Sequence, residues 1–351
     1  MSETETPEIK KTRVAINGFG RIGRAFFKLA FERPELEIVA INDLSDVHNL
    51  GYLLQYDTAQ GHGDYDLAYA EDGSSMTVDG HQVAFIQQRD PAALPWKDMN
   101  VDIVIESTGF FTNYSDAQMH IDAGAKHVVI SAPAKGESVP GVSATVLMGV
   151  NESELATCSI TSNASCTTNA GSPLMTILSE TIGIEKAMLN TIHGYTATQS
   201  IVDGPAKGDF RRGRAAAQNI IPTTTGAAKA TTLALPHLKG KFDGIAMRVP
   251  VVAGSIADIT FIASRDTSVE EMNEILTKAA EEERWHTTFA VTDEPIVSSD
   301  IIGSTYASIA DLSFTNVVDG NLVKVLAWYD NEMGYTSSLV DHVVKAGKKF
   351  Q

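Results

Sequence analysis

The hydrophobic pattern of the first 163 residues alternates between short apolar runs and stretches with apolar positions every three or four residues. The short runs, which predict strands, lie at residues 14–16, 36–41, 101–105 and 127–130. The stretches with helical spacing lie at residues 24–32 and 115–125, and Pro34 ends the first of them. Strands that alternate with helices in this order pair in parallel. We therefore predict an α/β fold with a Rossmann-type, doubly wound parallel sheet.

After about residue 163 the pattern changes. A stretch with helical spacing covers residues 167–182. The later strand-like runs are longer and alternate apolar with polar positions; they lie at residues 188–192, 244–251, 256–262, 308–314 and 322–328. Such alternation is typical of a sheet with one covered face. We predict a second, α+β domain with a mixed or antiparallel sheet.

Local signals in this second part predict turns and helix ends. The pair Asp319-Gly320 predicts a hairpin turn. Residues 268–271 read as a capping box that opens a helix running to about Trp285. Residues 222–226, a proline, three threonines and a glycine, predict a hydroxyl-rich turn before another helix. The last stretch, residues 335–348, is amphipathic and is expected to pack back on the first unit.

The composition narrows the class of protein. The 351 residues include 27 Lys and Arg against 44 Asp and Glu, a net charge of −17, which argues against a general binder of nucleic acid or of an anionic membrane. No apolar run approaches the 18 residues of a membrane span. Two cysteines exclude a disulfide framework and a cysteine-rich zinc site. Residues 1–13 lack the apolar core of a secretion signal, so we expect the protein in the reducing cytoplasm. We also expect no bound metal.

The first candidate site is the glycine-rich sequence GFGRIG at residues 18–23. Glycine-rich loops are common turns, so the motif alone carries little weight. Here it follows a predicted strand, opens a predicted helix, and Asp43 lies 20 residues after Gly23. In a dinucleotide site the glycines let the backbone approach the pyrophosphate, and an acid at this distance binds ribose hydroxyls and repels a 2′-phosphate. The context predicts NAD rather than NADP.

The second candidate site is the polar sequence SNASCTTN at residues 162–169. A cysteine is often just a small buried hydrophobic residue, and Cys158 is expected to be one. Cys166 differs because it lies in a turn that opens a helix, where a helix N-terminus lowers the pKa of a thiol and backbone N–H groups hold an oxyanion. A thiol nucleophile needs a base. From its place on a strand-like run, His193 is equally a base or a core histidine with a satisfied hydrogen bond.

The third candidate site is basic. Residues 205–214 contain four Lys or Arg against one Asp, a local charge of +3 inside an acidic chain. A charge run is usually a solvated face, but the hydroxyl-rich residues 222–226 follow this one closely. Arg248 interrupts an apolar run, and a buried arginine without an anion is costly. Arginines, hydroxyls and a helix N-terminus together predict a phosphate-binding site.

In their order along the chain, these motifs resemble those of one known family. The chain resembles the phosphorylating glyceraldehyde-3-phosphate dehydrogenases of the common bacterial and eukaryotic type in its sequences GFGRIG, SNASCTTN, TATQSIVDGP, RAAAQNIIPTTTGAAKA and WYDNEMGY. The likeness runs from Arg13 to the C-terminus. It implies an NAD-binding domain at residues 14–163 that a C-terminal helix at 334–351 completes, a catalytic domain at 164–333, and a flexible arm at 1–12.

The resemblance also assigns roles to individual residues. Cys166 matches the nucleophile and His193 the base that activates it. Contacts to NAD are implied for Asn17, Gly18, Gly20, Arg21, Ile22, Gly23, Asp43, Arg89, Thr108, Ser131, Asn331 and Tyr335. Binding of substrate and phosphate is implied for Ser165, Thr167, Thr196, Arg211, Thr225, Gly226 and Arg248. The chain departs from the commoner family sequence at residues 251–255, next to one phosphate pocket.

The implied reaction is the oxidative phosphorylation of D-glyceraldehyde 3-phosphate to 1,3-bisphosphoglycerate with reduction of NAD, a step of glycolysis and gluconeogenesis. The resemblance routes it through a hemithioacetal and a thioester of Cys166, which inorganic phosphate then cleaves. A rival enzyme is erythrose-4-phosphate dehydrogenase, which needs no phosphate acceptor; the match at Thr225, Gly226 and Arg248 favours the first. A remote alternative is a non-catalytic, RNA-binding role on the same fold. The family also implies a homotetramer.

Overall fold

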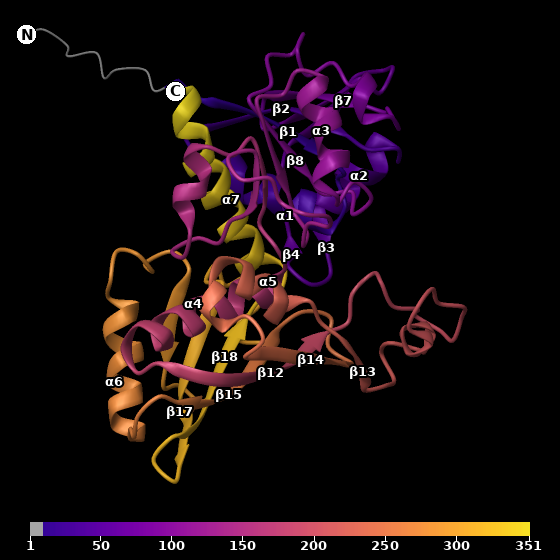
Figure 1. Ribbon diagram of the computed structural model, residues 1–351. Coiled ribbons are helices and arrows are strands. Elements are labelled where there is room, and N and C mark those ends of the chain that lie inside the picture. Colours follow the sequence, from indigo (N-terminus) through magenta and orange to yellow (C-terminus); the bar gives the residue numbers. More distant parts are fainter. Residues whose placement is uncertain (1–9) are drawn as a thin grey trace, which may run out of the picture.

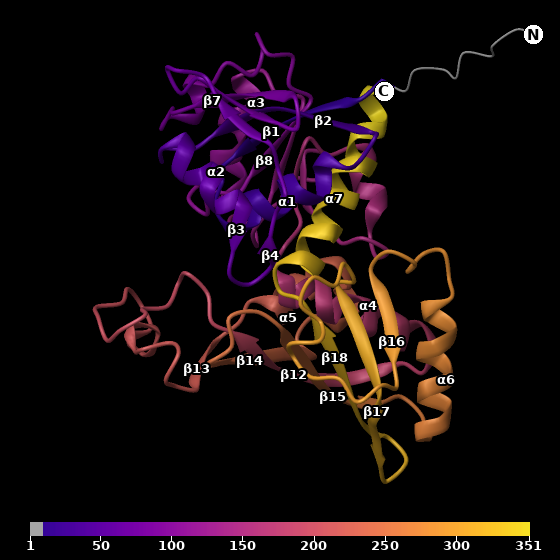
Figure 2. The same cartoon turned by 180° about the vertical axis from the view of Figure 1, so that it is seen from behind.

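The computed structural model describes residues 10–351, which form two lobes, one above the other in Figures 1 and 2. Of the predicted arm, residues 1–9 lie outside the described residues. Thr12, which the prediction also placed in the arm, is already the first residue of strand β1 (Thr12–Asn17). It belongs to the strand because it pairs in parallel with Leu36.

The first lobe is built on a nine-stranded sheet in the order β10-β11-β9-β8-β1-β2-β7-β6-β5. Its strands after β1 are β2 (Leu36–Asn42), β5 (Leu67–Tyr69), β6 (Ser75–Val78), β7 (His81–Ile86), β8 (Ile103–Glu106), β9 (His127–Ile130), β10 (Ser143–Thr145) and β11 (Ile160–Ser162). The strands from β10 to β7 pair in parallel, whereas β6 and β5 extend the edge antiparallel. The predicted Rossmann-type sheet is confirmed.

Helices cover this sheet and close its core. They are α1 (Arg21–Phe31), α2 (Val47–Gln55), α3 (Tyr114–Asp122) and the C-terminal α7 (Met333–Gly347); a small hairpin, β3 (Tyr56–Asp57) and β4 (Gly61–His62), follows α2. Helix α7 lies against α1, and its Leu339 and Val343 share one buried cluster with Phe26, Val14 and Ile16. The end of the chain therefore returns to the first lobe, where Figure 1 shows α7 beside the sheet.

The second lobe is built on a seven-stranded mixed sheet in the order β13-β14-β12-β15-β18-β17-β16. Its strands are β12 (Ile184–Gly194), β13 (Ile221–Thr224), β14 (Phe242–Val249), β15 (Ser255–Ala263), β16 (Phe289–Thr292), β17 (Ser308–Val318) and β18 (Leu322–Tyr329). Only the pairs β12–β14 and β16–β17 are parallel within the described part of the chain. The mixed sheet is as predicted.

Three helices pack on one face of the second sheet: α4 (Cys166–Thr181), α5 (Ala227–Ala234) and α6 (Val269–Ala280). Their apolar sides form a second core with the sheet, in which Leu174 and Leu276 meet Ile259 and Phe261. Five short 3₁₀ turns connect the elements, at Pro91–Ala93, Glu152–Ala156, Phe210–Gly213, Pro236–Leu238 and Lys348–Phe350. The segment between β12 and β13 projects from the side of this lobe (Figure 2).

Two local predictions fail for packing reasons. The helix capped by Ser268 ends at Ala280 rather than near Trp285, because a series of turns carries Trp285 into the second core. Residues 221–224 form the edge strand β13 instead of a turn. An edge strand accommodates Pro222 because its missing N–H is not needed by a second neighbour.

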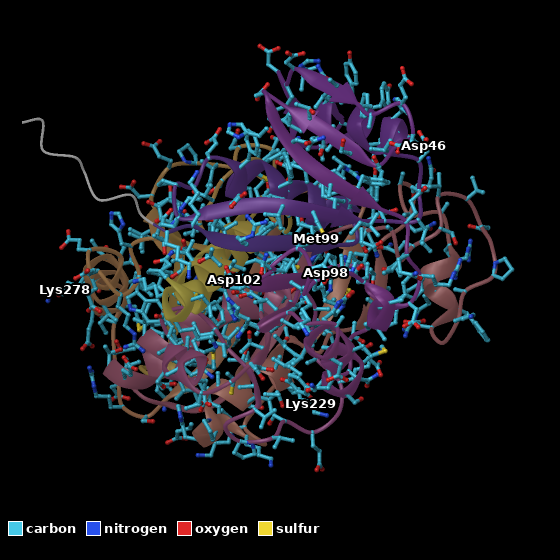
Figure 3. The ribbon with its side chains drawn as sticks, turned by 90° about the horizontal axis from the view of Figure 1, so that it is seen from above. Asp46, Asp98, Met99, Asp102, Lys229 and Lys278 are labelled. Atoms are coloured by element: carbon cyan, nitrogen blue, oxygen red, sulfur yellow. The ribbon has the colours of Figure 1, made fainter. Side chains whose placement is uncertain are left out.

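Other local predictions hold. The Ser268 hydroxyl accepts the Glu271 N–H at 3.2 Å, which caps α6. Asp319 and Gly320 both have positive φ, 49° and 77°, as a two-residue hairpin turn requires. Charged side chains such as Asp46, Lys229 and Lys278 lie on the outside of the molecule (Figure 3), where the excess acid of the composition is solvated.

Candidate active site

In the glycine-rich turn, the backbone just after β1 lies close to the backbone just after β8. Gly18 has φ +96°, and a Cβ there would lie 2.7 Å from the Thr108 nitrogen. A Cβ on Gly23 would lie 2.1 Å from the Gly18 oxygen, so both positions require glycine. At Gly20, the N-cap of α1, a Cβ would meet nothing within 4 Å, and no side chain caps the helix. The N-terminus of α1 is therefore left open to an anion.

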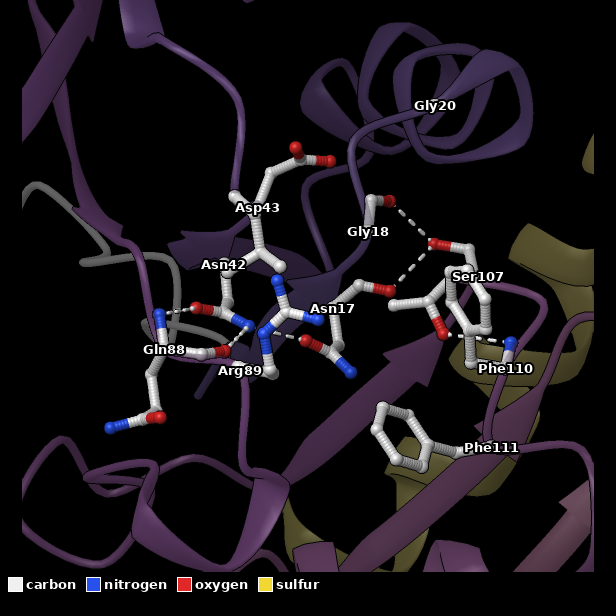
Figure 4. Close-up of a pocket in the computed structure, with 12 residues that line it drawn as sticks. Asn17, Gly18, Gly20, Asn42, Asp43, Gln88, Arg89, Ser107, Phe110 and Phe111 are labelled. Carbon is white, nitrogen blue, oxygen red and sulfur yellow. Dashed lines mark hydrogen bonds between the residues drawn. The ribbon is translucent and has the colours of Figure 1, made fainter.

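A cavity of about 450 Å³ lies at this turn (Figure 4). The predicted cofactor residues that line it are Asn17, Gly18, Gly20, Asp43, Arg89 and Thr108. The sequence did not single out its other lining residues, Asn42, Leu44, Gln88, Ser107, Phe110 and Phe111. The Asp43 carboxylate accepts the Phe19 N–H at 2.8 Å and still has free acceptor positions for hydroxyl groups. An open helix N-terminus, an acid and two aromatic rings fit a dinucleotide.

A buried carboxylate organises the floor of the cavity. Glu106 accepts hydrogen bonds from Asn17 Nδ2 at 2.6 Å, from the Thr108 N–H at 2.9 Å and from the Thr108 hydroxyl. Trp96 Nε1 donates to His120 Nδ1 at 3.0 Å, so the His120 proton sits on Nε2, which contacts Glu106 at 3.1 Å. These bonds hold the two cavity residues in place. Glu106 gave no signal in the sequence beyond its strand.

The remaining cofactor residues of the prediction do not line the cavity. The Arg21 side chain is held in ion pairs with Asp57 and Glu332, so only its backbone is free to meet a ligand. Ile22 packs against the first core. Ser131 follows β9, and its N–H donates to the Glu106 carbonyl at 2.9 Å.

Cys166 is the first residue of α4. Ser165 is the N-cap, and its hydroxyl accepts the Thr168 N–H at 3.1 Å. The Cys166 Sγ lies 3.3 Å from His193 Nε2, and His193 comes from the far end of β12. The structure therefore brings together the two residues predicted as nucleophile and base. His193 is also a buried residue with satisfied hydrogen bonds, so its position is compatible with a base and with a core histidine.

Arg248 lies on the other side of the imidazole. Strands β12 and β14 run in parallel with His193 opposite Arg248. His193 Nδ1 is 2.6 Å from the Gly194 oxygen and 2.8 Å from Arg248 Nη1, so this nitrogen has a partner in either tautomer. When Nδ1–H donates to the carbonyl, the Nε2 lone pair faces the thiol. Burial, and then the Arg248 charge, lower the pKa of His193 to about 3.

The surroundings of Cys166 favour the neutral thiol. Burial raises the pKa of Cys166, while Arg248 and the hydrogen bonds of Thr167 act in the opposite direction. The backbone N–H groups of Cys166 and Thr167 at the helix N-terminus do lower this pKa, as predicted, but the loss of solvation outweighs them, so the net shift is upward. Cys166 and His193 are thus both shifted toward their neutral forms.

Tyr329 contacts both His193 and Thr167, the residue next to Cys166, and was not among the predicted site residues. Its buried hydroxyl lies 3.0 Å from Thr167 Oγ1 and 2.7 Å from Thr191 Oγ1, and its ring meets His193 edge to face. The Thr167 hydroxyl, which was predicted to hold substrate, is thus engaged with Tyr329. A tyrosine that closes a strand gives no chemical signal until the partner strand is known.

Arg248 is the cation of this site. It is half-buried, and none of the ion pairs among residues 10–351 involves it. Thr196 lies just past β12, beyond His193, while Thr225 and Gly226 precede α5, whose N-terminus has no side-chain cap. A cation without a carboxylate partner is ready for an anion.

The structure does not bring the predicted Arg211 to this site. Its side chain is 59% exposed and pairs with Asp209. The neighbouring Arg212 instead donates to Thr223 Oγ1 at 2.9 Å, and its charge reaches Arg248, where it helps to lower the pKa. In a run of adjacent arginines, only the fold decides which one faces inward.

Asn331 and Tyr335 approach the thiol loop from the C-terminal side. The Ser255 hydroxyl accepts the Gly194 N–H at 3.2 Å and donates to Asn331 Oδ1 at 2.9 Å, which leaves the amide nitrogen of Asn331 free to donate. The Tyr335 hydroxyl donates to the Ala164 oxygen at 3.2 Å. Ser255, the last residue of the run that departs from the family sequence, therefore links His193's strand to Asn331.

Two further features of residues 10–351 bear on function. No group of three or more His, Cys, Asp and Glu side chains among them is arranged to hold a metal ion. None of their helices has the length and apolar character to cross a membrane.

Comparison with known proteins agrees with this geometry. Residues 12–114 match the family model "Glyceraldehyde 3-phosphate dehydrogenase, NAD binding domain", and residues 165–331 match "Glyceraldehyde 3-phosphate dehydrogenase, C-terminal domain". Relatives named glyceraldehyde-3-phosphate dehydrogenase are 51% identical over 332 residues in Thermotoga maritima (94% of this chain, 97% of the relative), 49% over 340 in Streptomyces avermitilis (96% and 99%) and 47% over 339 in Bacillus subtilis (96% and 98%). The chain belongs to the glyceraldehyde 3-phosphate dehydrogenase family.

Proposed function

We propose that this chain is an NAD-dependent phosphorylating glyceraldehyde-3-phosphate dehydrogenase. It oxidises D-glyceraldehyde 3-phosphate, uses inorganic phosphate as the acyl acceptor and yields 1,3-bisphosphoglycerate. The observation that carries the proposal is the contact of Cys166 Sγ with His193 Nε2 at 3.3 Å, beside the unpaired Arg248. A nucleophile, a base and a cation for a phosphate or an oxyanion then meet in one place.

NAD supplies the hydride acceptor when bound, and the chain's own residues orient it. The cavity residues Asn17, Asp43 and Thr108 would hold the adenosine side, and the Asn331 amide N–H would be available to the nicotinamide side. The Asp43 carboxylate also disfavours a 2′-phosphate, so we expect a preference for NAD over NADP.

The thiol and the imidazole act in sequence. Cys166 attacks the aldehyde carbon, and its proton passes to His193 Nε2, which then donates to the new hemithioacetal oxygen. His193 takes this proton back as the hydride leaves, and a thioester remains on Cys166. The low pKa of His193 favours the return of the proton to the hemithioacetal oxygen, while formation of the C–S bond drives its uptake from the thiol.

Phosphate then attacks the thioester carbonyl. We assign Arg248, Thr196, Thr225 and Gly226 to the substrate phosphate and the attacking phosphate, and we add Arg212, which the geometry favours over Arg211. An oxygen of the attacking phosphate forms the new C–O bond, the C–S bond breaks, and Cys166 leaves as the thiolate. Tight placement of phosphate matters here because water competes for the same thioester.

We also carry three expectations from the sequence as part of the proposal. The NAD-binding domain comprises residues 14–163 with the C-terminal segment 334–351, and residues 164–333 form the catalytic domain; the matched family regions, 12–114 and 165–331, support this division. The enzyme acts as a homotetramer. It works in the cytoplasm, where Cys166 stays a free thiol.

Steady-state rates with two aldehydes test the proposal. Purified enzyme with NAD is expected to turn over D-glyceraldehyde 3-phosphate only with phosphate present, and to use D-erythrose 4-phosphate poorly. Phosphate-independent turnover of the four-carbon aldehyde would instead identify the rival erythrose-4-phosphate dehydrogenase. A Cys166→Ala variant serves as the control for non-enzymatic reduction of NAD.

A further inference from the structure

A chain of buried polar side chains links the C-terminal segment to the loop that carries the thiol. Its inner members are all buried: His127, Thr161, Asn163, Asn169, Ser338 and His342. None of them lines the cofactor cavity or pairs with the Cys166 sulfur. From Lys349 as far as Asn163, each hydrogen bond fixes the direction of the next.

The outer end is Lys349. Its Nζ lies 3.1 Å from His127 Nδ1, 3.3 Å from the Leu155 oxygen and 2.9 Å from the Cys158 oxygen. An ammonium group has three N–H donors and no acceptor. His127 Nδ1 must therefore accept, which leaves the ring neutral with its proton on Nε2.

Two histidines carry the direction inward. His127 Nε2–H donates to Thr161 Oγ1 at 2.9 Å, and the Thr161 hydroxyl donates to His342 Nε2 at 2.8 Å. The His342 proton therefore sits on Nδ1, which donates to Asn163 Oδ1 at 3.1 Å. Both rings are neutral and carry their protons on opposite nitrogens. Burial lowers the pKa of His342 to about 3, in keeping with a ring that stays neutral.

The inner end is the backbone next to the thiol. Asn163 Nδ2 donates to Ser338 Oγ at 3.2 Å, and Ser338 Oγ lies 2.9 Å from both Asn169 Oδ1 and the Tyr335 oxygen, which share its one proton. Asn169 Nδ2 then donates to the oxygens of Asn163 at 2.7 Å and Ser165 at 2.9 Å. These two carbonyls flank Ala164, which is fully buried with φ +55°, in the left-handed region that an L-residue adopts only at a cost.

We propose that His342 is a positioning residue for Cys166, and that the chain from Lys349 to Asn169 holds residues 163–165 in the strained conformation that places the sulfur against His193. The inference rests on the proposed function in taking Cys166 as the nucleophile. Without the His342 N–H, the Asn163 oxygen is buried without a donor and the loop relaxes. The sulfur then moves away from the Nε2 acceptor that receives its proton, and the thiol ionises less readily.

Alkylation of the full-length, cofactor-free protein by iodoacetamide tests this, because it reports Cys166 without any substrate. The rate is followed across pH by the mass of the Cys166 peptide, with the buried Cys158 as an internal reference. His342→Leu, which removes both nitrogens, is expected to shift the midpoint of the profile to higher pH and to slow alkylation at neutral pH by about tenfold. His342→Asn keeps one N–H donor for Asn163 and is expected to restore most of the rate.

Two further variants make the outcome decisive. Val343→Ala removes buried apolar contact from the same helix; it is expected to lower the melting temperature while leaving the alkylation profile unchanged. Ser338→Ala cuts the link between Asn163 and Asn169 and gives the answer if His342→Leu does not fold. The proposal is overturned if the variants that cut the chain melt earlier but alkylate along the parental profile, or if Val343→Ala shifts that profile equally. Failure of the aldehyde assays would not affect this readout.

Discussion

The cofactor cavity and the thiol site differ in how their polar groups are paired. Under the cavity, Glu106 receives three hydrogen bonds from Asn17 and Thr108 and a fourth contact from His120. At the thiol, Arg248 has no carboxylate partner among residues 10–351, and Cys166 and His193 are both shifted toward their neutral forms. The polar side chains under the cavity therefore have their hydrogen-bond partners within the protein. The thiol site keeps a free positive charge and a proton acceptor for groups that the substrate brings.

The largest effect is expected from removal of the sulfur. Cys166→Ala should lower turnover by at least about 10⁴-fold, because no other group forms the thioester. The NAD dissociation constant should change little, since the cavity does not depend on the thiol. Turnover by absorbance and NAD binding by fluorescence titration measure the two effects separately. A variant that loses both equally would mean that the two sites are one unit.

Removal of the free cation should come next. Arg248→Met is expected to lower kcat/KM by about 10²–10³-fold through the loss of an anion contact. Because the Arg248 charge lowers the pKa of His193, the same change raises this pKa. The acid limb of the pH–rate profile should therefore move to higher pH. An unmoved limb would show that Arg248 does not act on the imidazole.

The cavity side is expected to respond in specificity rather than in rate. Asp43→Ser removes the charge that opposes a 2′-phosphate and should improve kcat/KM with NADP by about tenfold or more relative to NAD. Asp46→Ser is the matched control, because Asp46 caps α2 a short distance away but does not line the cavity. If the ratio of kcat/KM with NADP to kcat/KM with NAD is the same in the parental protein and both variants, Asp43 does not determine cofactor specificity.

The smallest effect is a pH dependence of stability. His193 and His342 have folded-state pKa values of about 3, against about 6.5 when unfolded, so both bind protons preferentially in the unfolded chain. Their contribution is full above pH 6.5 and is lost as the pH falls toward 3. The groups that face His342 add no acid to offset this: Thr161 and Asn163 are neutral, and Lys345 and Lys349 are cations.

Melting temperatures between pH 7 and 4 measure this slope. The parental protein should lose stability steadily over this range, and His342→Asn should lose less because one of the three buried histidines with a lowered pKa, His127, His193 and His342, is gone. Identical slopes for the two proteins would contradict the neutral state of His342 in the folded chain.

The two regions also differ in how far the sequence predicts them. The cofactor turn is local: strand, glycines, helix and Asp43 follow one another, so spacing suffices to identify it. The thiol site joins residues from strands β12, β14 and β18 with Cys166 at the start of α4. Only the order of the strands in the sheet brings these residues together. Cys166, His193 and Arg248 could be singled out by type or resemblance. Glu106, Ser255 and Tyr329 could not, because each acts through a neighbour that is distant in sequence.

Packing also limited the prediction of the fold. Apolar spacing gave no signal for helix α2 or for strands β5, β6, β7, β10, β11 and β16, but both types of sheet came out as predicted. The end of α6 did not, because burial of Trp285 overrides the helical pattern. The sequence also could not show whether Arg211 or Arg212 faces the site, because both residues have the same chemistry. Only the turn before β13 sets which of them points inward.

The central claim is that Cys166 carries a thioester that phosphate releases. Rapid mixing of enzyme, NAD and D-glyceraldehyde 3-phosphate without phosphate tests it most directly. The account predicts a burst of NADH equal to the number of active sites, an acyl adduct on the Cys166 peptide by mass spectrometry, and resumed turnover when phosphate is added. Steady turnover without a burst or an adduct in the absence of phosphate would contradict it.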